Sequence, residues 1–449
     1  MKKTRLITTI LSVLFIICSL FFVSSCDLLT GESGGGTGGG GTGGGGIEWG
    51  PADYTATSIA ALKTWLSSKP ANTASKPYNI KLNVSDLGGE STDAGSLGKV
   101  IEDSGKYVNL DLSGSTLTEI EDCAFQYCNT LTGIILPDSV ESIGIWAFRF
   151  CSGLASVNIP ASVKIIENGA FTNSGLTGHI TIPGTVNTLG QQSFFGCPKL
   201  TSVTIEYGVN IGGLGLVFGC CESLTTAIVN CEVVPGFGEC TKLTSVTLGE
   251  NVKIIDVDAF EQCTSLTGIN IPDSVTTIGP NAFEKCRSLT SITIPNNVTV
   301  INAFTFEGCT RLASVTLGNS VEVIGWQAFS RCSSLSEITI PASVKKIGVS
   351  AFIYCANLLR VHILCDIPFL PKDHPDYRTT FIEDSAFGTG LPPPPDDDYI
   401  GDLFFKYYKI NINNPTMYNG WMFGTLLFDG NPGTYYRTSS ASLEWVYEG

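Results

Sequence analysis

The chain is poor in charged residues and in the residue types that carry catalysis. Of its 449 residues, 15% are Asp, Glu, Lys or Arg, and only His179, His362 and His374 are histidines. The sequence contains no H-E-x-x-H motif and no phosphate-binding G-K-S/T motif, the patterns typical of zinc proteases and nucleotide-binding enzymes. We therefore expect a protein that is not an enzyme, with no catalytic residues, no cofactor and no metal.

Basic residues are scarce as well. Lys and Arg number 26 against 41 Asp and Glu, so the formal net charge is −15. The first 25 residues carry Lys2, Lys3 and Arg5 but no carboxylate, so the chain without them is more acidic still. An acidic surface without a basic run argues against nucleic acid and against adsorption to anionic lipid.

What the chain has instead is an internal repeat. A Phe-x-x-Cys pair recurs about every 23 residues, and one copy carries Ser174 three residues after Phe171 in place of the cysteine. The other ten pairs are Phe125/Cys128, Phe148/Cys151, Phe194/Cys197, Phe218/Cys221, Phe237/Cys240, Phe260/Cys263, Phe283/Cys286, Phe306/Cys309, Phe329/Cys332 and Phe352/Cys355. A fixed period of this length predicts a solenoid, because each repeat has an apolar face that only its neighbours can cover.

One regular repeat, residues 266–288, illustrates the expected local structure. Ile269 and Ile271 alternate with polar residues, which predicts a half-buried strand. A second, shorter strand is expected around Ile278. Phe283 and Cys286 follow at helical spacing, which predicts a single turn of α- or 3₁₀-helix. Stacked repeats would align these side chains as continuous apolar columns.

The repeat pattern, L-x-x-I-x-I-P-x-S-V-x-x-I-G-x-x-A-F-x-x-C, resembles the BspA-like leucine-rich repeats of bacterial surface proteins. Segments 289–300, 312–324 and 335–347 carry it almost unbroken, and the resemblance covers residues 108 to 387. It implies a strand-rich α/β fold, a leucine-rich-repeat solenoid. Members of that family include adhesins that bind host matrix proteins and other bacteria, so the resemblance implies a role in adhesion.

The sixteen cysteines of the chain would suggest disulfides in an exported protein. Ten of them, however, occupy one repeat position, where we expect small buried thiols that pack as modest hydrophobes. A linear column of thiols does not converge on a point as a zinc site requires. The cysteines outside the column that could form a bridge are Cys123, Cys220, Cys231 and Cys365.

The segments on either side of the repeats are expected to cap the solenoid. Residues 51–107 should form an N-terminal α/β cap with helices over 58–66 and 91–102 and a strand over 78–84. The solenoid should span 108–390. Residues 391–449 should form a β-rich region with strands within 403–412, 421–428 and 434–447, acting as the second cap or as a separate binding module.

The first 50 residues are typical of an export signal and a tether. Residues 1–25 combine a basic start with an apolar run, and Val23-Ser24-Ser25-Cys26 resembles a lipobox in which Cys26 is lipid-modified. An uncleaved membrane anchor is the alternative. Residues 26–50 are mostly Gly and form a flexible tether. We expect a monomer that is lipid-anchored to the bacterial envelope, at the outer membrane or the cell surface.

Candidate binding residues are those that break the repeat pattern. Trp146, Arg149 and Phe150 in one repeat, and Trp326 and Arg331 in another, are large or charged where equivalent residues are small. Trp and Arg are common interface anchors, although these residues could equally shield the convex side of the coil. The partner would be a protein or a glycan on a host or neighbouring cell.

Two other functions remain open at this point. The same fold and anchor would suit a periplasmic scaffold. An enzyme would require a cleft in the insertion at 356–399 with His362 or His374 in it. The Asp373-His374-Pro-Asp376 segment and Asp396–Asp398 are explained as polar loops rather than as metal sites.

Overall fold

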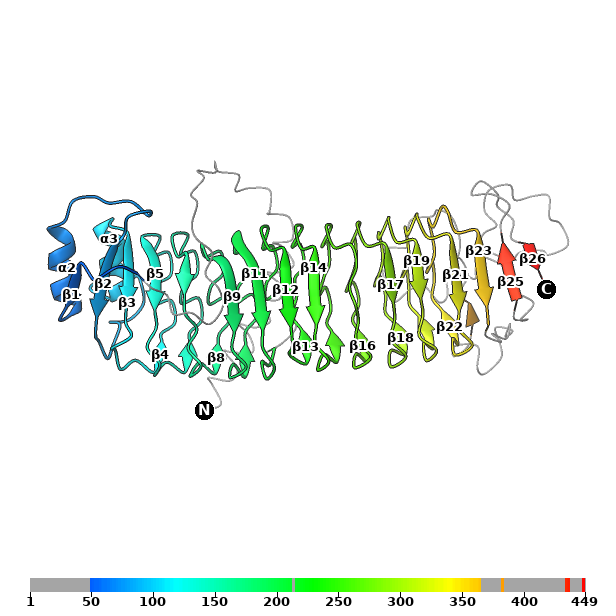
Figure 1. Ribbon diagram of the computed structural model, residues 1–449, viewed down its shortest axis with the longest axis horizontal. Helices are drawn as coiled ribbons and strands as arrows, with labels where there is room; N and C mark the ends of the chain where they lie inside the picture. The colour runs from blue at the N-terminus through cyan, green and yellow to red at the C-terminus, as the bar shows by residue number, and fades with distance from the viewer. Residues whose placement is uncertain (1–48, 212–214, 365–380, 383–432, 437–445, 449) are drawn as a thin grey trace, which may run out of the picture. The chain divides into compact units, whose positions relative to one another are not determined.

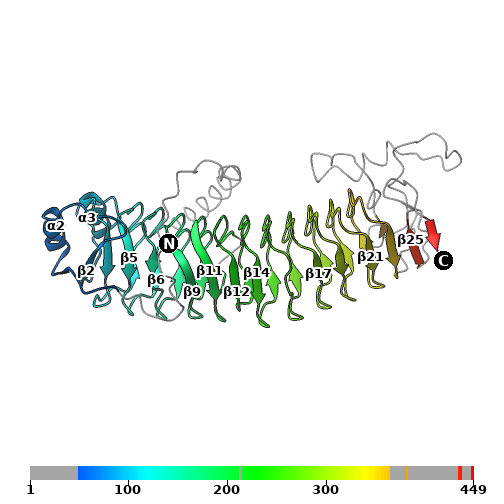
Figure 2. The same cartoon turned by 45° about the horizontal axis from the view of Figure 1, so that its top comes forward.

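The computed structural model describes residues 49–211, 215–364, 381–382, 433–436 and 446–448. These residues form two helices and a long series of short strands. Within the described residues, no helix combines the length and apolar character needed to cross a membrane. Successive repeats lie side by side in Figure 1, and Figure 2 shows the same stack turned toward the viewer.

The first strands of most repeats, together with β1 and β2 of the N-terminal region, form a discontinuous parallel sheet. One segment has the order β1-β2-β3-β5-β7, with strands Tyr54–Ala56, Tyr78–Leu82, Val108–Asp111, Leu131–Ile135 and Ser156–Val157. The next contains β9 (Thr177–Ile182), β11 (Lys199–Ile205), β12 (Thr226–Val229) and β14 (Ser245–Leu248). Then follow the pair β17 (Ser291–Thr293) and β19 (Ser314–Thr316), and the pair β21 (Glu337–Ile340) and β23 (Arg360–Ile363).

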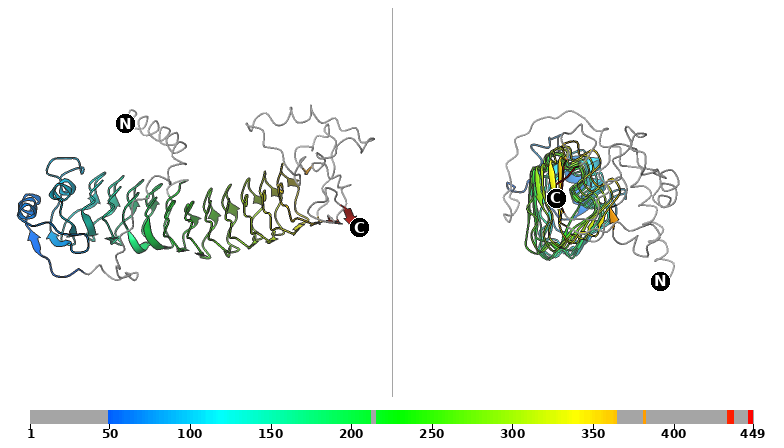
Figure 3. Two further views of the ribbon diagram at one scale, coloured as in Figure 1. Left: turned by 90° about the horizontal axis from the view of Figure 1, so that it is seen from above. Right: turned by 90° about the vertical axis from the view of Figure 1, so that its right-hand side faces the viewer.

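The second strand of each repeat forms a parallel row of its own. Most of its members have only two residues: β4 (Glu119–Ile120), β6 (Ser142–Ile143), β8 (Ile165–Ile166), β10 (Thr188–Leu189), β13 (Val233–Val234), β15 (Ile254–Ile255), β16 (Thr277–Ile278), β18 (Val300–Ile301), β20 (Val323–Ile324), β22 (Lys346–Ile347) and β24 (Phe381–Ile382). The pairings join each strand to its neighbour one repeat away, as with Ile143 and Ile166. Seen along the stack, the repeats superimpose (Figure 3).

The interior of the stack is a column of phenylalanines. All eleven, from Phe125 to Phe352, are at most 1% exposed. Each ring stacks on the next with centroids 4.9–5.8 Å apart. Burying one such side chain contributes about 1.5–3 kcal/mol, and only the adjacent repeats can bury it. The strand rows and this column confirm the predicted strand-rich solenoid.

The expected helical turn after the second strand is wrong. Two residues of that segment adopt left-handed conformations, Asn281 with φ 55° and Lys285 with φ 57° in the regular repeat, and a right-handed helix cannot contain them. The backbone N–H groups alternate instead: those of Asn281, Phe283 and Lys285 donate to carbonyls of the next repeat, on Ala303, Thr305 and Glu307. The segment therefore forms a third ladder of hydrogen bonds between repeats.

Two further expectations differ in detail. Residues 267–271 form no strand, and Ile269 is half-buried while Ile271 is 7% exposed. This repeat lies between β14 and β17, where the first row of strands is interrupted. The helix expected over 91–102 is α3 (Leu97–Ser104). It begins later because Gly95, which lies within the expected range, has positive φ, and Ser96 caps the helix by accepting a hydrogen bond from Lys99 N–H.

The other helix, α2 (Ile59–Ser67), lies where it was expected. Ser58 caps it, since its hydroxyl accepts a hydrogen bond from the Ala61 N–H at 3.1 Å. Leu62 and Leu66 are buried on its inner face. The predicted strand over 78–84 is β2. The apolar spacing of this region was therefore sufficient to place both elements.

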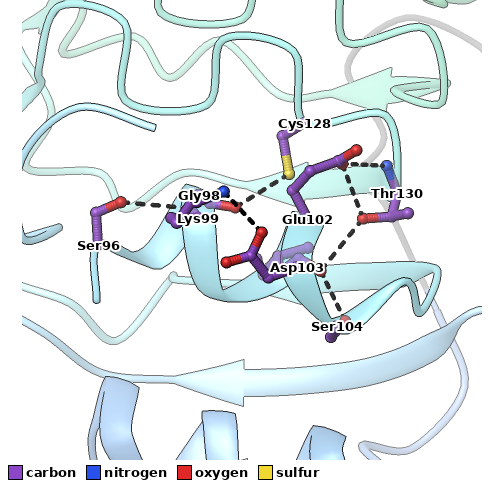
Figure 4. Close-up of polar contacts among 9 residues, drawn as sticks. Ser96, Gly98, Lys99, Glu102, Asp103, Ser104, Cys128 and Thr130 are labelled. Carbon is purple, nitrogen blue, oxygen red and sulfur yellow. Dashed lines mark hydrogen bonds and ion pairs between the residues drawn. The ribbon is translucent and has the colours of Figure 1, made fainter. Parts of the chain in front are cut away.

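Helix α3 covers the first repeat (Figure 4). The Cys128 thiol donates to the carbonyl of Gly98 at 3.6 Å, and Glu102 Oε2 accepts from the backbone N–H and the hydroxyl of Thr130, both at 3.3 Å. A Cβ on Gly98 would lie 2.2 Å from the Ala124 carbonyl oxygen. Glycine at this helix position is what allows α3 to approach the repeat backbone so closely.

At the other end, β25 (Gly433–Tyr436) pairs antiparallel with β23, and β26 (Val446–Glu448) pairs with β25. These strands cover the edge that β23 would otherwise expose. A strand was expected within 434–447. β25 begins one residue before this segment and β26 ends one residue after it. The strands expected within 403–412 and 421–428 lie outside the described residues, as do His374 and Asp396–Asp398.

Candidate functional site

The cysteine column lies beside the phenylalanine column and is shielded from solvent. Nine of its thiols donate to the carbonyl of the phenylalanine one repeat earlier, at 2.8–3.4 Å. Ser174, also fully buried, is 3.3 Å from Cys197 Sγ. Burial raises the pKa of column thiols such as Cys263 well above the usual range. These cysteines therefore hold repeats together and are not reactive groups.

The two ends of the column differ from the uniform series of equivalent thiols that the sequence predicts. Cys128, in the first repeat, donates to the Gly98 carbonyl of α3 instead of to a phenylalanine carbonyl. Cys355, in the last repeat that the structure describes, is 5% exposed, whereas the column cysteines from Cys151 to Cys332 are 0% exposed. Its thiol still donates to the Phe329 carbonyl at 3.1 Å. Each inner thiol lies between two neighbouring repeats, which enclose it.

The cysteines outside the column form no disulfide in the described part of the chain. Cys123 and Cys220 are partly exposed, and Cys231 is buried. Burial raises the pKa of Cys231 to about 12, and burial, Glu90 and Asp122 raise the pKa of Cys123. Cys365 lies outside the described residues.

Most side chains at the left-handed positions of the repeats are partly or fully exposed, although Ser350 is only 8% exposed. The first of the two left-handed positions directly precedes the column cysteine. Its residues include Tyr127, Phe150, Glu239, Gln262, Lys285, Arg331 and Tyr354. The other lies two residues before the phenylalanine, where Trp146 and Phe304 are found. Both positions thus form rows along the repeats, and most of the sequence-predicted binding residues lie in them or next to them.

Tyr127, Trp146, Arg149 and Phe150 come together in one group, which we call the Arg149 cluster. The Arg149 guanidinium lies over two rings, with its Cζ 5.0 Å from the centroid of Trp146 and 4.7 Å from that of Phe150. The Phe150 ring stacks on Tyr127 of the previous repeat, with centroids 5.2 Å apart and planes 9° from parallel. Tyr127 is 52% exposed. The cluster is therefore an accessible aromatic surface with one cation in it.

The two other predicted residues do not join this cluster. Trp326 packs edge-on against Phe304, with centroids 4.6 Å apart. Arg331 lies over Tyr354 at 5.6 Å, and its Nη1 is 3.5 Å from Glu307 Oε1. The sequence did not indicate Tyr127 and Tyr354 as binding residues, although Tyr127 occupies the same repeat position as Phe150. Reading the outward rows across repeats would have found it.

A row of carboxylates follows the central repeats. Glu261, Glu284 and Glu307 occupy the position directly after the phenylalanine in successive repeats. Burial, then Glu284 and then Asp258, raise the pKa of Glu261, and burial and Glu284 raise that of Glu307. Lys285 lies 2.5 Å from Glu284 and Arg331 neutralises Glu307 in part. The row is a partly compensated acidic stripe.

The described residues contain a cavity of about 480 Å³ between the 89–93 loop and the second row of strands. Its lining is acidic, with Glu90, Asp93, Glu119, Glu121 and Glu167 among its residues. Burial, Asp86 and Glu119 raise the pKa of Glu121. No group of three or more His, Cys, Asp or Glu side chains in the described part is arranged to hold a metal ion.

The histidines of the described chain are placed on strands. His179 on β9 is hydrogen-bonded through Nδ1 to Ser202 Oγ at 2.9 Å and through Nε2 to Thr181 Oγ1 at 3.2 Å. His362 lies on β23 in register with Thr339 and Thr434. Both lie among hydroxyl-bearing residues. The enzyme alternative requires a cleft in the insertion at 356–399, and residues 365–380 and 383–399 of that insertion lie outside the described residues.

Comparison with known proteins finds the family described as BspA type Leucine rich repeat region at residues 115–234 and 236–359, in six copies. Among solved structures, a leucine-rich repeat protein from Bacteroides ovatus is 27% identical, covering 61% of this chain and 75% of that one, with a TM-score of 0.43. One from Eubacterium ventriosum is 21% identical, covering 72% and 93%, also with a TM-score of 0.43. A leucine rich cell surface protein from Faecalibacterium prausnitzii is 25% identical over 57% and 79%, with a TM-score of 0.34. No curated protein matches the chain.

Proposed function

Because the chain belongs to the BspA-type leucine-rich repeat family, we propose that it is an exported, non-catalytic binding protein. It is anchored to the bacterial envelope by a lipid on Cys26 and binds a partner on a host or neighbouring cell through the outward side chains of its repeats. The protein acts as a monomer. Residues 26–50 are the flexible tether that holds the solenoid away from the membrane.

The Arg149 cluster is the observation that carries this proposal. Large aromatic and Arg side chains on a surface are the residue types that dominate binding energy at protein interfaces. Here they are gathered from two adjacent repeats by ring stacking and by cation–π contacts at 4.7 and 5.0 Å. The cluster lies outside the column of buried phenylalanines, and its Tyr127 is 52% exposed.

Protease digestion of intact cells tests the proposal. The mature protein is detected with an antibody against the repeats, before and after the envelope is permeabilised. Loss of the protein without lysis supports adhesion to another cell. Protection until permeabilisation contradicts adhesion and assigns the protein to a periplasmic scaffold. A Cys26→Ser variant, which cannot carry the lipid, should be released from the membrane fraction.

A further inference from the structure

The charge on Arg149 has no carboxylate partner within the part of the chain that the structure describes. Six ion pairs are found there, and Arg149 is in none of them. Asp122, a carboxylate in the preceding repeat, accepts a hydrogen bond from the Ile145 N–H at 2.7 Å instead. Ring stacking engages the faces of a guanidinium and leaves its five N–H donors, which lie in its plane, available.

The cluster holds this guanidinium in place before any partner arrives. Trp146 and Phe150, whose rings contact it, both have left-handed backbone conformations with φ 57° and 58°. Gly169 of the next repeat packs against Trp146, since a Cβ there would come within 2.5 Å of Trp146 Cδ1. Tyr127 supports Phe150 by stacking. A group that is already ordered loses less conformational entropy on binding.

Arg331 shows what the same combination of residues looks like when its charge is met internally. It also lies over an aromatic ring, that of Tyr354 at 5.6 Å, but Glu307 of the previous repeat lies 3.5 Å from its Nη1. Among the described residues, one arginine that lies over a ring is thus paired with a carboxylate and the other is not. The guanidinium of Arg149 is therefore open to a carboxylate from another molecule.

We propose that the Arg149 cluster binds a side-chain carboxylate of an acidic segment on a protein partner. This inference rests on the proposed binding function and names the chemistry of its partner. The in-plane donors of a guanidinium match a carboxylate in a bidentate geometry. The edges of aromatic rings carry positive potential, so the outward edges of Tyr127 and Phe150 also favour an anion.

The contacts within the cluster favour a protein over a glycan. A sugar binds aromatic side chains through their faces, and the faces of Phe150 and Trp146 are engaged by Tyr127 and Arg149. The formal net charge of −15 opposes association with an acidic segment elsewhere on the surface. Binding of such a segment therefore depends on the guanidinium of Arg149, which takes part in none of the ion pairs of the described residues.

A peptide titration tests the inference. A fluorescein-labelled oligoglutamate and an oligoglutamine of the same length are titrated with the purified full chain, and anisotropy is recorded. The oligoglutamate should bind and the oligoglutamine should not. Arg149→Gln should weaken binding at least about tenfold, since a hydrogen-bonded charge contributes about 1.5–3 kcal/mol. Arg149→Lys should also weaken it, because an ammonium lacks the planar fork.

Arg331→Gln is the matched control, since it removes the same charge from a ring-stacked arginine that already has Glu307. It should leave oligoglutamate binding unchanged, and circular dichroism should show that all variants fold. Absence of oligoglutamate binding, or equal binding by Arg149→Gln, overturns the inference. Binding of hyaluronate, a carboxylated glycan, that depends on Arg149 while oligoglutamate fails to bind overturns the choice of a protein.

These outcomes are separate from the fate of the proposed function. The titration uses purified protein and does not depend on which side of the envelope the protein occupies. A protein that is digested on intact cells but shows no Arg149-dependent peptide binding retains its proposed function and loses this inference. A protected protein that binds oligoglutamate through Arg149 does the reverse, and its acidic partner lies inside the envelope.

Discussion

The Cys286 thiol donates a hydrogen bond to the Phe260 carbonyl of the preceding repeat, with Sγ and O 3.1 Å apart. That carbonyl also accepts the Cys263 N–H within its own repeat. The contact links the two apolar columns and recurs along the stack, so the cysteine position serves as a donor as well as a small apolar group.

Substitution of Cys286 measures this role. We expect Cys286→Ala to lower the free energy of unfolding by about 1–2 kcal/mol, from a lost hydrogen bond and a small cavity. Cys286→Ser should cost less, because a hydroxyl can donate in the same direction and Ser174 occupies the equivalent position. Urea unfolding followed by circular dichroism gives both values. A serine variant as unstable as the alanine variant would show that the thiol acts through volume alone.

Gly98 provides a test in which the expected sign opposes helix propensity. An alanine normally stabilises a helix relative to glycine by up to about 1 kcal/mol. In α3 its Cβ would lie 2.2 Å from the Ala124 carbonyl oxygen, so we expect Gly98→Ala to destabilise the protein by about 1–3 kcal/mol through overpacking. Lys99→Ala, at the neighbouring position whose ammonium pairs with Asp103, should change stability by less than about 0.5 kcal/mol. Thermal unfolding compares the two.

The row of carboxylates predicts a dependence of stability on pH. Burial and Glu284 raise the pKa of Glu261 in the folded protein. The ionised carboxylate therefore destabilises the fold when the pH exceeds that raised value. Glu261→Gln should therefore raise the free energy of unfolding at pH 7 by about 0.5 kcal/mol. The difference should vanish below about pH 4, where the group is protonated in both states.

The control for this experiment is Glu250→Gln, which makes the same change in net charge at an exposed position. It should leave the free energy of unfolding unchanged at both pH values. Urea unfolding at pH 7 and pH 4 measures all three proteins. A Glu261→Gln variant that is less stable than the parent at pH 7 would mean that the carboxylate makes a favourable contact.

Thiol labelling distinguishes the column from the other cysteines. In the native protein at neutral pH, a maleimide should modify Cys220 and Cys123 before any column cysteine, because the column thiols are buried and burial raises the pKa of thiols such as Cys263. Cys123 should react slowly, since burial, Glu90 and Asp122 raise its pKa too. Within the column, Cys355 should react first, because it is 5% exposed. Peptide mapping after timed quenching gives the order. Inner column cysteines that react as fast as Cys220 would contradict the packing.

The period of the sequence predicts the columns because stacking places equivalent residues on one another. It places Phe171 and Ser174 correctly in the series even though the cysteine is absent there. It does not predict the turn after the second strand, because Trp146, Lys285 and Arg331 are not residues that favour left-handed conformations. Gly169, Gly196 and Gly308, which have positive φ at the equivalent positions, carry that signal.

The candidate site was only partly predictable for a similar reason. Trp146, Arg149 and Phe150 are conspicuous because they break the pattern of the repeat. That Arg149 lies over both rings, while Arg331 is paired with Glu307, depends on side-chain conformation and on contacts between repeats. Neither follows from one-dimensional spacing. Pairing each repeat with its neighbour would have brought Tyr127 and Phe150 together.

Photo-crosslinking on intact cells tests most directly the claim that the repeat surface at the Arg149 cluster binds a partner. A benzoylphenylalanine replaces Tyr127, which is 52% exposed in the cluster, or Tyr207, which is 69% exposed outside it. We predict one defined crosslinked protein from position 127, lost when Arg149→Gln is added, and none from position 207. Crosslinks that are the same at both positions, or that persist without Arg149, would contradict the account.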